Sequence, residues 1–129
     1  MACLSGAARV EKDLLEKNPD PNLRAYIVWV PKQFAMERDV PQATARVMDP
    51  RARHYWDGNR KLMRGYQARL GMDEDAWDIY LLYGPGARWT EAAPPAPEFW
   101  MQQLGIANVT PWNPAEFAWM AGKMLEARR

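Results

Sequence analysis

The chain has 129 residues, of which 48% are hydrophobic, and its 17 basic and 16 acidic residues leave a formal net charge of +1. This length suits a single domain, residues 1–129, with a core of its own. The balanced charge provides no field that would attract nucleic acid or an anionic membrane. One cysteine excludes an internal disulfide and a cysteine-rich zinc site. We therefore expect neither a nucleic-acid-binding protein nor a disulfide-stabilised secreted protein.

The sequence also indicates where the protein resides and what it does not bind. No segment approaches the roughly 20 apolar residues that span a bilayer. The residues after Met1 form a charged amphipathic segment, unlike the apolar centre of a secretory signal. We expect a cytoplasmic protein without membrane contact. The sequence has no metal-ligand cluster and no glycine-rich phosphate loop, so we expect no metal and no cofactor.

The first predicted element is a helix over residues 3–17. Apolar side chains recur at 4-3-4 spacing along one face, with charged side chains opposite: Cys3, Ala7, Val10 and Leu14. Asparagine and two prolines within residues 18–22 end the helix. Cys3 therefore lies in the first turn of this helix.

A strand is predicted next, over residues 23–30, because β-branched and aromatic residues follow one another there. The nearly continuous apolar run is typical of a strand that is buried on both faces. A short helix should follow as far as about Met48, with Asp39 as its N-cap and Pro41 in its first turn.

The middle of the chain predicts a second strand over residues 52–57 and a helix over residues 60–70. Asn59 can cap the start of this helix, and Gly71 stands at its C-cap position. His54, the only histidine, lies in the strand, where a structural role is the simpler interpretation.

Another strand, apolar like the one at residues 23–30, is predicted over residues 77–83 and is followed by the glycine turn of residues 84–86. Residues 87–89 can return as a short antiparallel strand. The last helix should cover residues 114–128, with Asn113 as its N-cap.

Before that last helix, residues 97–104 predict a short helix rich in aromatic side chains. Phe99, Trp100 and Met101 could form a lid or a docking surface, and they are the candidate recognition residues. The alternative is a loop that packs these side chains against the sheet.

Helices and strands alternate along the chain, which predicts an α/β fold with a mostly parallel sheet, helices on both faces and a C-terminal antiparallel hairpin. This order resembles the thioredoxin-like superfamily, in particular its TlpA and peroxiredoxin-like branch and uncharacterised bacterial thioredoxin-like proteins. The segments that carry the resemblance are Cys3 before residues 23–30, the Asp57-Gly58 pair before Arg64-Gly65-Tyr66, and residues 77–89 with 94–100.

The resemblance implies parts that this sequence lacks. The superfamily usually carries a Cys-x-x-Cys motif, but three residues after Cys3 stands Gly6. A cis-proline is implied before the second core strand, where this chain has residues 75–77 and no proline. A core strand is implied before the first helix, between the strands at 23–30 and 77–83, and this N-terminal strand is missing.

Three arrangements could satisfy the edges of the two strands that would flank the missing one. The two strands could pair directly, a second copy or a partner could donate a strand, or the chain could be a shortened form of a longer protein. We expect direct pairing or a homodimer.

Two functions follow from these observations. A cysteine in the first turn of a helix meets backbone N–H groups that favour its thiolate. The resemblance therefore implies a single-cysteine thiol-disulfide oxidoreductase with Cys3 as catalytic nucleophile and an external thiol or protein disulfide as partner. The alternative is a non-catalytic thioredoxin-like binding or assembly module, in which Cys3 is a small apolar residue of the helix.

Overall fold

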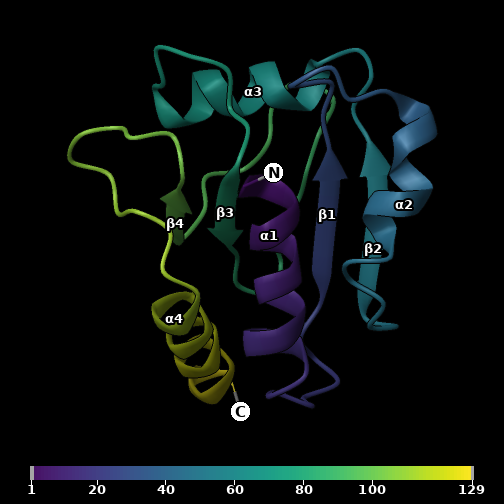
Figure 1. Cartoon of the computed structure of the whole chain (residues 1–129). Coiled ribbons are helices and arrows are strands. Elements are labelled where there is room, and N and C mark those ends of the chain that lie inside the picture. The colour runs from purple at the N-terminus through teal and green to yellow at the C-terminus, as the bar shows by residue number, and fades with distance from the viewer. Residues whose placement is uncertain (1, 129) are drawn as a thin grey trace.

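The computed structural model describes residues 2–128, and Figure 1 shows its helices and strands in chain order. The helical elements are α1 (Ala2–Arg9), the π-helical η1 (Val10–Leu15), the 3-10 turn η2 (Glu37–Asp39), α2 (Val40–Thr44), α3 (Lys61–Leu70) and α4 (Pro114–Ala127). The strands are β1 (Ala25–Trp29), β2 (Ala52–Trp56), β3 (Ile79–Leu82) and β4 (Phe99–Gln102). The α/β class is confirmed.

The strands form two separate two-stranded sheets. In the parallel pair, β1 lies beside β2 with Ala25 opposite Ala52 and Trp29 opposite Trp56. In the antiparallel pair, β3 lies beside β4 with Ile79 opposite Gln102. The expected mostly parallel sheet is therefore wrong, because each half of the chain builds its own pair.

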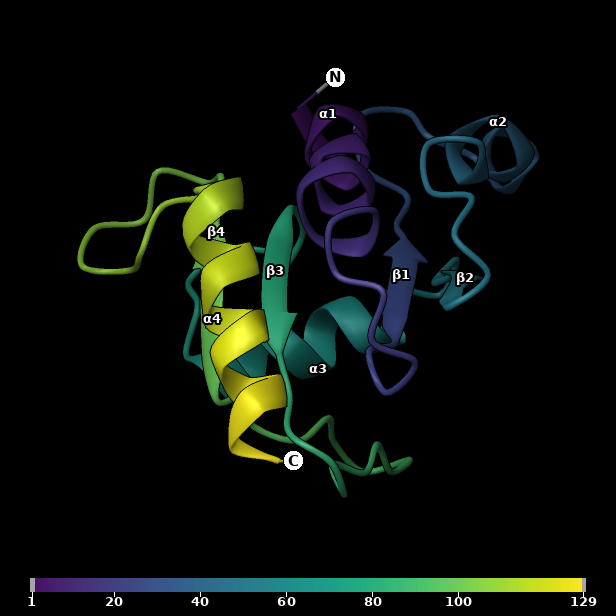
Figure 2. The same cartoon turned by 90° about the horizontal axis from the view of Figure 1, so that it is seen from below.

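Figures 1 and 2 show the spatial order of the strands as β4, β3, β1, β2. β1 and β3 are thus neighbours that run in opposite directions, yet within residues 2–128 no ladder joins them. Helix α1 covers the space between them on one face, and α3 lies on the other face (Figure 2). The expected direct pairing of these two strands is wrong.

The antiparallel partner of β3 differs from the expected one. Residues 87–89 form no strand, and the Trp89 indole donates to the Tyr66 hydroxyl at 2.8 Å. Residues 97–104 were expected as a helix, and this expectation is wrong: Phe99–Gln102 is strand β4. The antiparallel edge therefore forms across a longer connection than a hairpin turn.

Helix ends follow the sequence signals in part. The Asn113 side chain accepts from the amide of Glu116 at 3.1 Å and caps α4 as predicted. Gly71 ends α3 in the left-handed region at φ 65°, also as predicted. Asn59 does not cap α3, because the Asp57 carboxylate accepts from the amides at 62 and 63 instead, at 3.2 and 2.9 Å.

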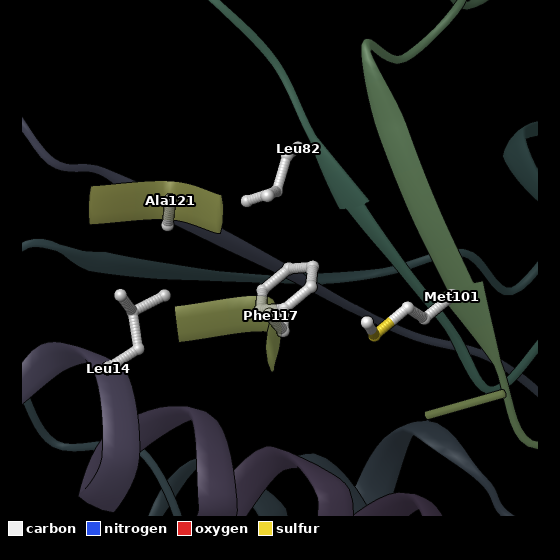
Figure 3. Close-up of a cluster of buried hydrophobic side chains, with 5 residues drawn as sticks. All are labelled: Leu14, Leu82, Met101, Phe117 and Ala121. Carbon is white, nitrogen blue, oxygen red and sulfur yellow. The ribbon is translucent and has the colours of Figure 1, made fainter. Parts of the chain in front are cut away.

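Three small hydrophobic clusters take the place of one continuous core. The first joins η1, the antiparallel pair and α4, and in Figure 3 Phe117 lies between Leu14 and Met101. The second joins α1 and η1 to the parallel pair around Leu15 and Val47. The third lies on the α3 side of β3, around Met63. Within residues 2–128 no helix combines the length and apolar character that a membrane crossing requires.

Candidate functional site

Cys3 lies in the first turn of α1, where the sequence placed it, and its side chain is partly buried. Helix α1 approaches β3 closely at Gly6, because a Cβ at this position would overlap the Tyr80 hydroxyl and lie 2.8 Å from Tyr80 Cζ. The start of α1 is therefore held against the start of β3, and this contact brings Cys3 near Asp78.

Three polar side chains form a connected cluster at this contact. The Tyr80 hydroxyl donates to Asp78 Oδ1 at 2.9 Å, and Gln103 Nε2 lies 2.9 Å from both of these oxygens. Asp78 precedes β3 with a φ of 52°, a left-handed conformation that is uncommon outside glycine. The backbone of Gln103 also donates to the Asp78 carbonyl at 3.1 Å, so β3 and β4 fix the cluster from both sides.

The electrostatics of the cluster do not favour a thiolate at Cys3. Burial and the nearby Asp78 carboxylate raise the pKa of the Cys3 thiol, and the backbone N–H groups of Cys3 and Leu4 oppose this only in part. The same burial and carboxylate raise the pKa of Tyr80. Both groups are therefore held in their neutral, proton-bearing forms at neutral pH.

Sequence reasoning identified Cys3 but not the cluster around it. Gln103 carries no motif, and its proximity to Asp78 depends on the long-range pairing of β3 with β4. The positive φ of Asp78 has no sequence signal that differs from an ordinary turn. Chemically, the cluster can hold a neutral thiol and a hydroxyl side by side at the N-terminal end of α1.

The three candidate recognition residues differ in how far their side chains are buried. Met101 is 0% exposed and belongs to the first hydrophobic cluster, so it is not part of an outer surface. Phe99 and Trp100 are half-buried on β4. The alternative, in which this segment packs its side chains against the sheet, describes the burial of Met101 correctly. The segment is, however, strand β4 and not a loop.

The next features are the hydrogen bonds of His54, the only histidine, and the residues that could bind a metal. His54 Nδ1 accepts from the Trp29 indole at 3.1 Å, and its Nε2 lies 2.9 Å from the Val47 carbonyl oxygen. Both ring nitrogens thus have internal partners, which fits a structural role. Among residues 2–128 no group of three or more His, Cys, Asp or Glu could hold a metal ion.

The edge of β1 that faces away from β2 carries backbone groups that have no ladder partner among the described residues 2–128. The amide of Ala25 donates to the Arg51 carbonyl, and the Trp29 carbonyl accepts from Asp57. In a parallel ladder, alternate residues bond to the same neighbour. Tyr26 and Val28 therefore point their N–H and C=O groups away from β2, toward β3.

The facing edge of β3 is unpaired in the same way. The carbonyls of Asp78 and Leu82 accept from β4 and the residue before it, at 3.1 and 2.9 Å. The intervening residues Ile79 and Leu81 therefore point their N–H and C=O groups toward β1. Because β1 and β3 are neighbours in Figures 1 and 2, two rows of backbone groups that join no ladder within residues 2–128 face one another.

Comparisons with known proteins add no relative to this description. No family model, no curated protein and no solved structure matches the chain.

Proposed function

We propose that this chain is a non-catalytic binding or assembly module of thioredoxin-like type, which associates with another polypeptide through the open edges of its strands. The observation that carries the proposal is the pair of facing, unpaired edges on β1 and β3. An unpaired edge is a template for another chain, and natural folds cover or blunt such edges. Here the apolar strands instead remain only partly buried, with Tyr26 59% exposed.

The thioredoxin-like part of the proposal is supported by the order and direction of the elements. A cysteine opens a helix that leads to β1, β1 lies parallel to β2, and β3 lies antiparallel to β4. Two features depart from the resemblance. Gly6 stands where a second cysteine would be, and no cis peptide bond occurs within residues 2–128.

Association can be tested by sedimentation velocity and by thermal unfolding at several protein concentrations. A module that completes itself by self-association, the homodimer alternative, becomes more stable as its concentration rises. A monomer at micromolar concentration whose unfolding temperature is independent of concentration would exclude the homodimer and leave a different partner as the remaining form of the proposal.

The second candidate is a thiol-disulfide oxidoreductase, favoured by the position of Cys3 at the start of α1. Its thiolate would attack one sulfur of a disulfide, form a mixed disulfide and release the other sulfur as a thiol. An external thiol would then attack the substrate sulfur, which returns Cys3 to its thiol form and leaves a new disulfide between substrate and external thiol.

One assay separates the two candidates. Hydroxyethyl disulfide is supplied as substrate with glutathione as external thiol, and the wild type is compared with Cys3→Ser. The non-catalytic module predicts equal turnover for both proteins, because the raised pKa of Cys3 leaves little thiolate at neutral pH. Turnover that exceeds that of the variant tenfold or more would refute the non-catalytic proposal and establish the redox candidate.

A further inference from the structure

We infer that the face of the parallel pair turned away from α1 binds a proline-rich, acidic segment of a partner protein. The segment lies in the polyproline II conformation across three aromatic rings and places a carboxylate at Arg53. This surface is a face of the strands and not one of their open edges, so the inference goes beyond the proposed function and adds a second site.

Three exposed aromatic rings lie together on this face. Alternate residues of β1 and β2 pack under α1 and η1, so Tyr26 and Tyr55 point to the opposite face. Their rings are stacked with centroids 6.4 Å apart, and the Trp89 ring lies 6.3 Å from that of Tyr26. Tyr26 is 59% exposed, Tyr55 49% and Trp89 44%. Exposed apolar groups that adjoin one another mark an interaction surface, whereas scattered ones do not.

The row of rings continues past Trp89, and there it holds a proline-rich segment of this chain. The Tyr83 ring packs edge-on against Trp89 with centroids 4.7 Å apart, and the Tyr83 hydroxyl donates to the Pro95 carbonyl at 2.7 Å. Arg69 Nε donates to the Pro94 carbonyl at 2.9 Å. Two consecutive carbonyls of a proline pair are thus bound by a tyrosine and an arginine beside the aromatic row.

The held segment has the sequence of a polyproline II ligand. Residues 94–97 contain three prolines, each of which fixes its own φ and pushes the residue before it toward the extended region. The Pro94 ring is buried against α3, where a Cβ at Gly65 would lie 2.9 Å from Pro94 Cδ. The chain therefore contains a working example of proline recognition on these rings.

The exposed end of the row offers the same kinds of donor. Arg53 lies opposite Tyr26 in the register of the parallel pair and two residues before Tyr55, so its side chain shares their face. Within residues 2–128 no hydrogen bond or ion pair engages the Arg53 guanidinium or the two tyrosine hydroxyls. An arginine and tyrosine hydroxyls thus adjoin exposed rings here, as Arg69 and Tyr83 do beside the held segment.

The spacing of the rings fits the rise of the ligand. A polyproline II helix rises about 3.1 Å per residue, so about two residues span the 6.4 or 6.3 Å between neighbouring rings, and about five residues span all three. Such a helix has no internal hydrogen bonds, which leaves its carbonyls free to accept from Tyr26 and Tyr55. Because the helix is already formed before binding, aromatic surfaces bind it at a low cost in ordering entropy.

The charge of this face favours an acidic peptide. Asp57 also follows this face of β2, but its carboxylate is bound by the amides at 62 and 63 of α3. A carboxylate beside the prolines of the ligand therefore gains a charge-assisted bond to Arg53. A single-stranded nucleic acid also stacks on exposed rings, but it requires a positively charged groove along its backbone. The hollow that Arg24 and Arg53 line also carries Glu16 and Asp49, which disfavours this ligand.

The test uses the whole chain and a synthetic peptide with the sequence of residues 91–98, capped at both ends, which contains three prolines between two glutamates. Backbone amide shifts in NMR spectra follow its binding. We expect saturable shifts at Tyr26, Arg53, Tyr55 and Trp89 at peptide concentrations up to about 1 mM. A peptide with alanine in place of the prolines should bind about tenfold more weakly. A peptide with glutamine in place of the glutamates should bind about threefold more weakly.

Protein variants give an independent arm. Tyr26→Thr and Tyr55→Thr remove a ring but keep a side chain that suits a strand, and each should weaken peptide binding about tenfold. Arg53→Ala should weaken it about threefold. Trp119→Ala on α4 is the matched control, because Trp119 is 60% exposed and lies outside this face, and it should leave binding unchanged.

Several results would overturn the inference. These are equal binding of the alanine peptide, unchanged binding in both threonine variants, or no shifts at about 1 mM peptide. Shifts confined to Tyr66 and Tyr83 would show that the peptide only displaces the chain's own segment. Shifts at Tyr26 and Tyr55 with single-stranded oligothymidylate but not with the peptide would assign the face to nucleic acid. A dimer in sedimentation that the peptide dissociates would assign the face to a second copy. If a threonine variant does not fold, the peptide series decides.

Discussion

Replacing Arg51 with alanine tests how the first helical segment is attached to the parallel pair. The Arg51 guanidinium donates to the Leu15 carbonyl at 2.6 Å, to the Asn18 carbonyl at 2.6 Å and to the Asp20 carbonyl at 3.0 Å. It also forms an ion pair with Asp49, at 2.8 Å between Nη2 and Oδ2. One side chain thus joins the end of η1, the turn that follows it and the start of β2.

The expected loss can be worked from these contacts. Each of the three bonds to a backbone carbonyl contributes about 1 kcal/mol net, and the side chain of Arg51 is only 15% exposed, so water replaces these bonds incompletely. The Asp49 pair adds to this loss, because its side chains are only 15% and 13% exposed and Arg51 lowers the pKa of Asp49 to about 2. We expect Arg51→Ala to lower the free energy of unfolding by at least about 3 kcal/mol and the unfolding temperature by at least about 10 °C.

Urea unfolding followed by circular dichroism measures the change, with Arg53→Ala as the matched control. Arg53 lies two residues further on, in β2, with its side chain exposed, and its removal should change the free energy by less than about 0.5 kcal/mol. Equal effects of the two substitutions would refute the reasoning, because the role of Arg51 would then be no greater than that of a surface charge.

Three further outcomes follow from single contacts. The hydrogen bonds and charge of Arg51 lower the pKa of Asp49 to about 2. The free energy of unfolding should therefore be constant above about pH 4 and fall as the pH drops toward 2. Acid titration followed by circular dichroism should show a weaker fall for Arg51→Ala. Asp57→Ala removes the carboxylate that caps α3 and should cost about 1–2 kcal/mol by urea unfolding, whereas Asp57→Asn should lose less. Gly6→Ala should lower the free energy of unfolding by about 1–3 kcal/mol, because the added Cβ overlaps Tyr80. Gly122→Ala on α4 adds a Cβ that meets no atom within 4 Å, and thermal unfolding should show a gain of about 0.5–1 kcal/mol.

The sequence predicted the elements that depend on local signals. The run at residues 23–30 and the Asn113 cap led to the right positions for β1 and α4, because each signal acts within a few residues. The strand at residues 52–57 was also predicted correctly, and the structure shows that it pairs in parallel with β1.

Elements that depend on distant partners were not predictable in the same way. A short apolar run such as residues 99–102 fits a helix or a strand equally well, and only its pairing with β3 decides. The N-cap of α3 was assigned to Asn59, whereas the Asp57 side chain reaches forward over the turn to the first amides of the helix. At the candidate site, the sequence identified Cys3, but Gln103 lies far from it along the chain and is brought near only by the same strand pairing.

The division of the hydrophobic core has a consequence for how the protein unfolds. The first two clusters share Val10 and Leu23, whereas the third lies on the opposite side of β3 and shares no member with the second. A domain with one continuous core loses its structure in a single cooperative event, but clusters that share few side chains can open separately. The calorimetric enthalpy of unfolding should therefore exceed the van't Hoff enthalpy.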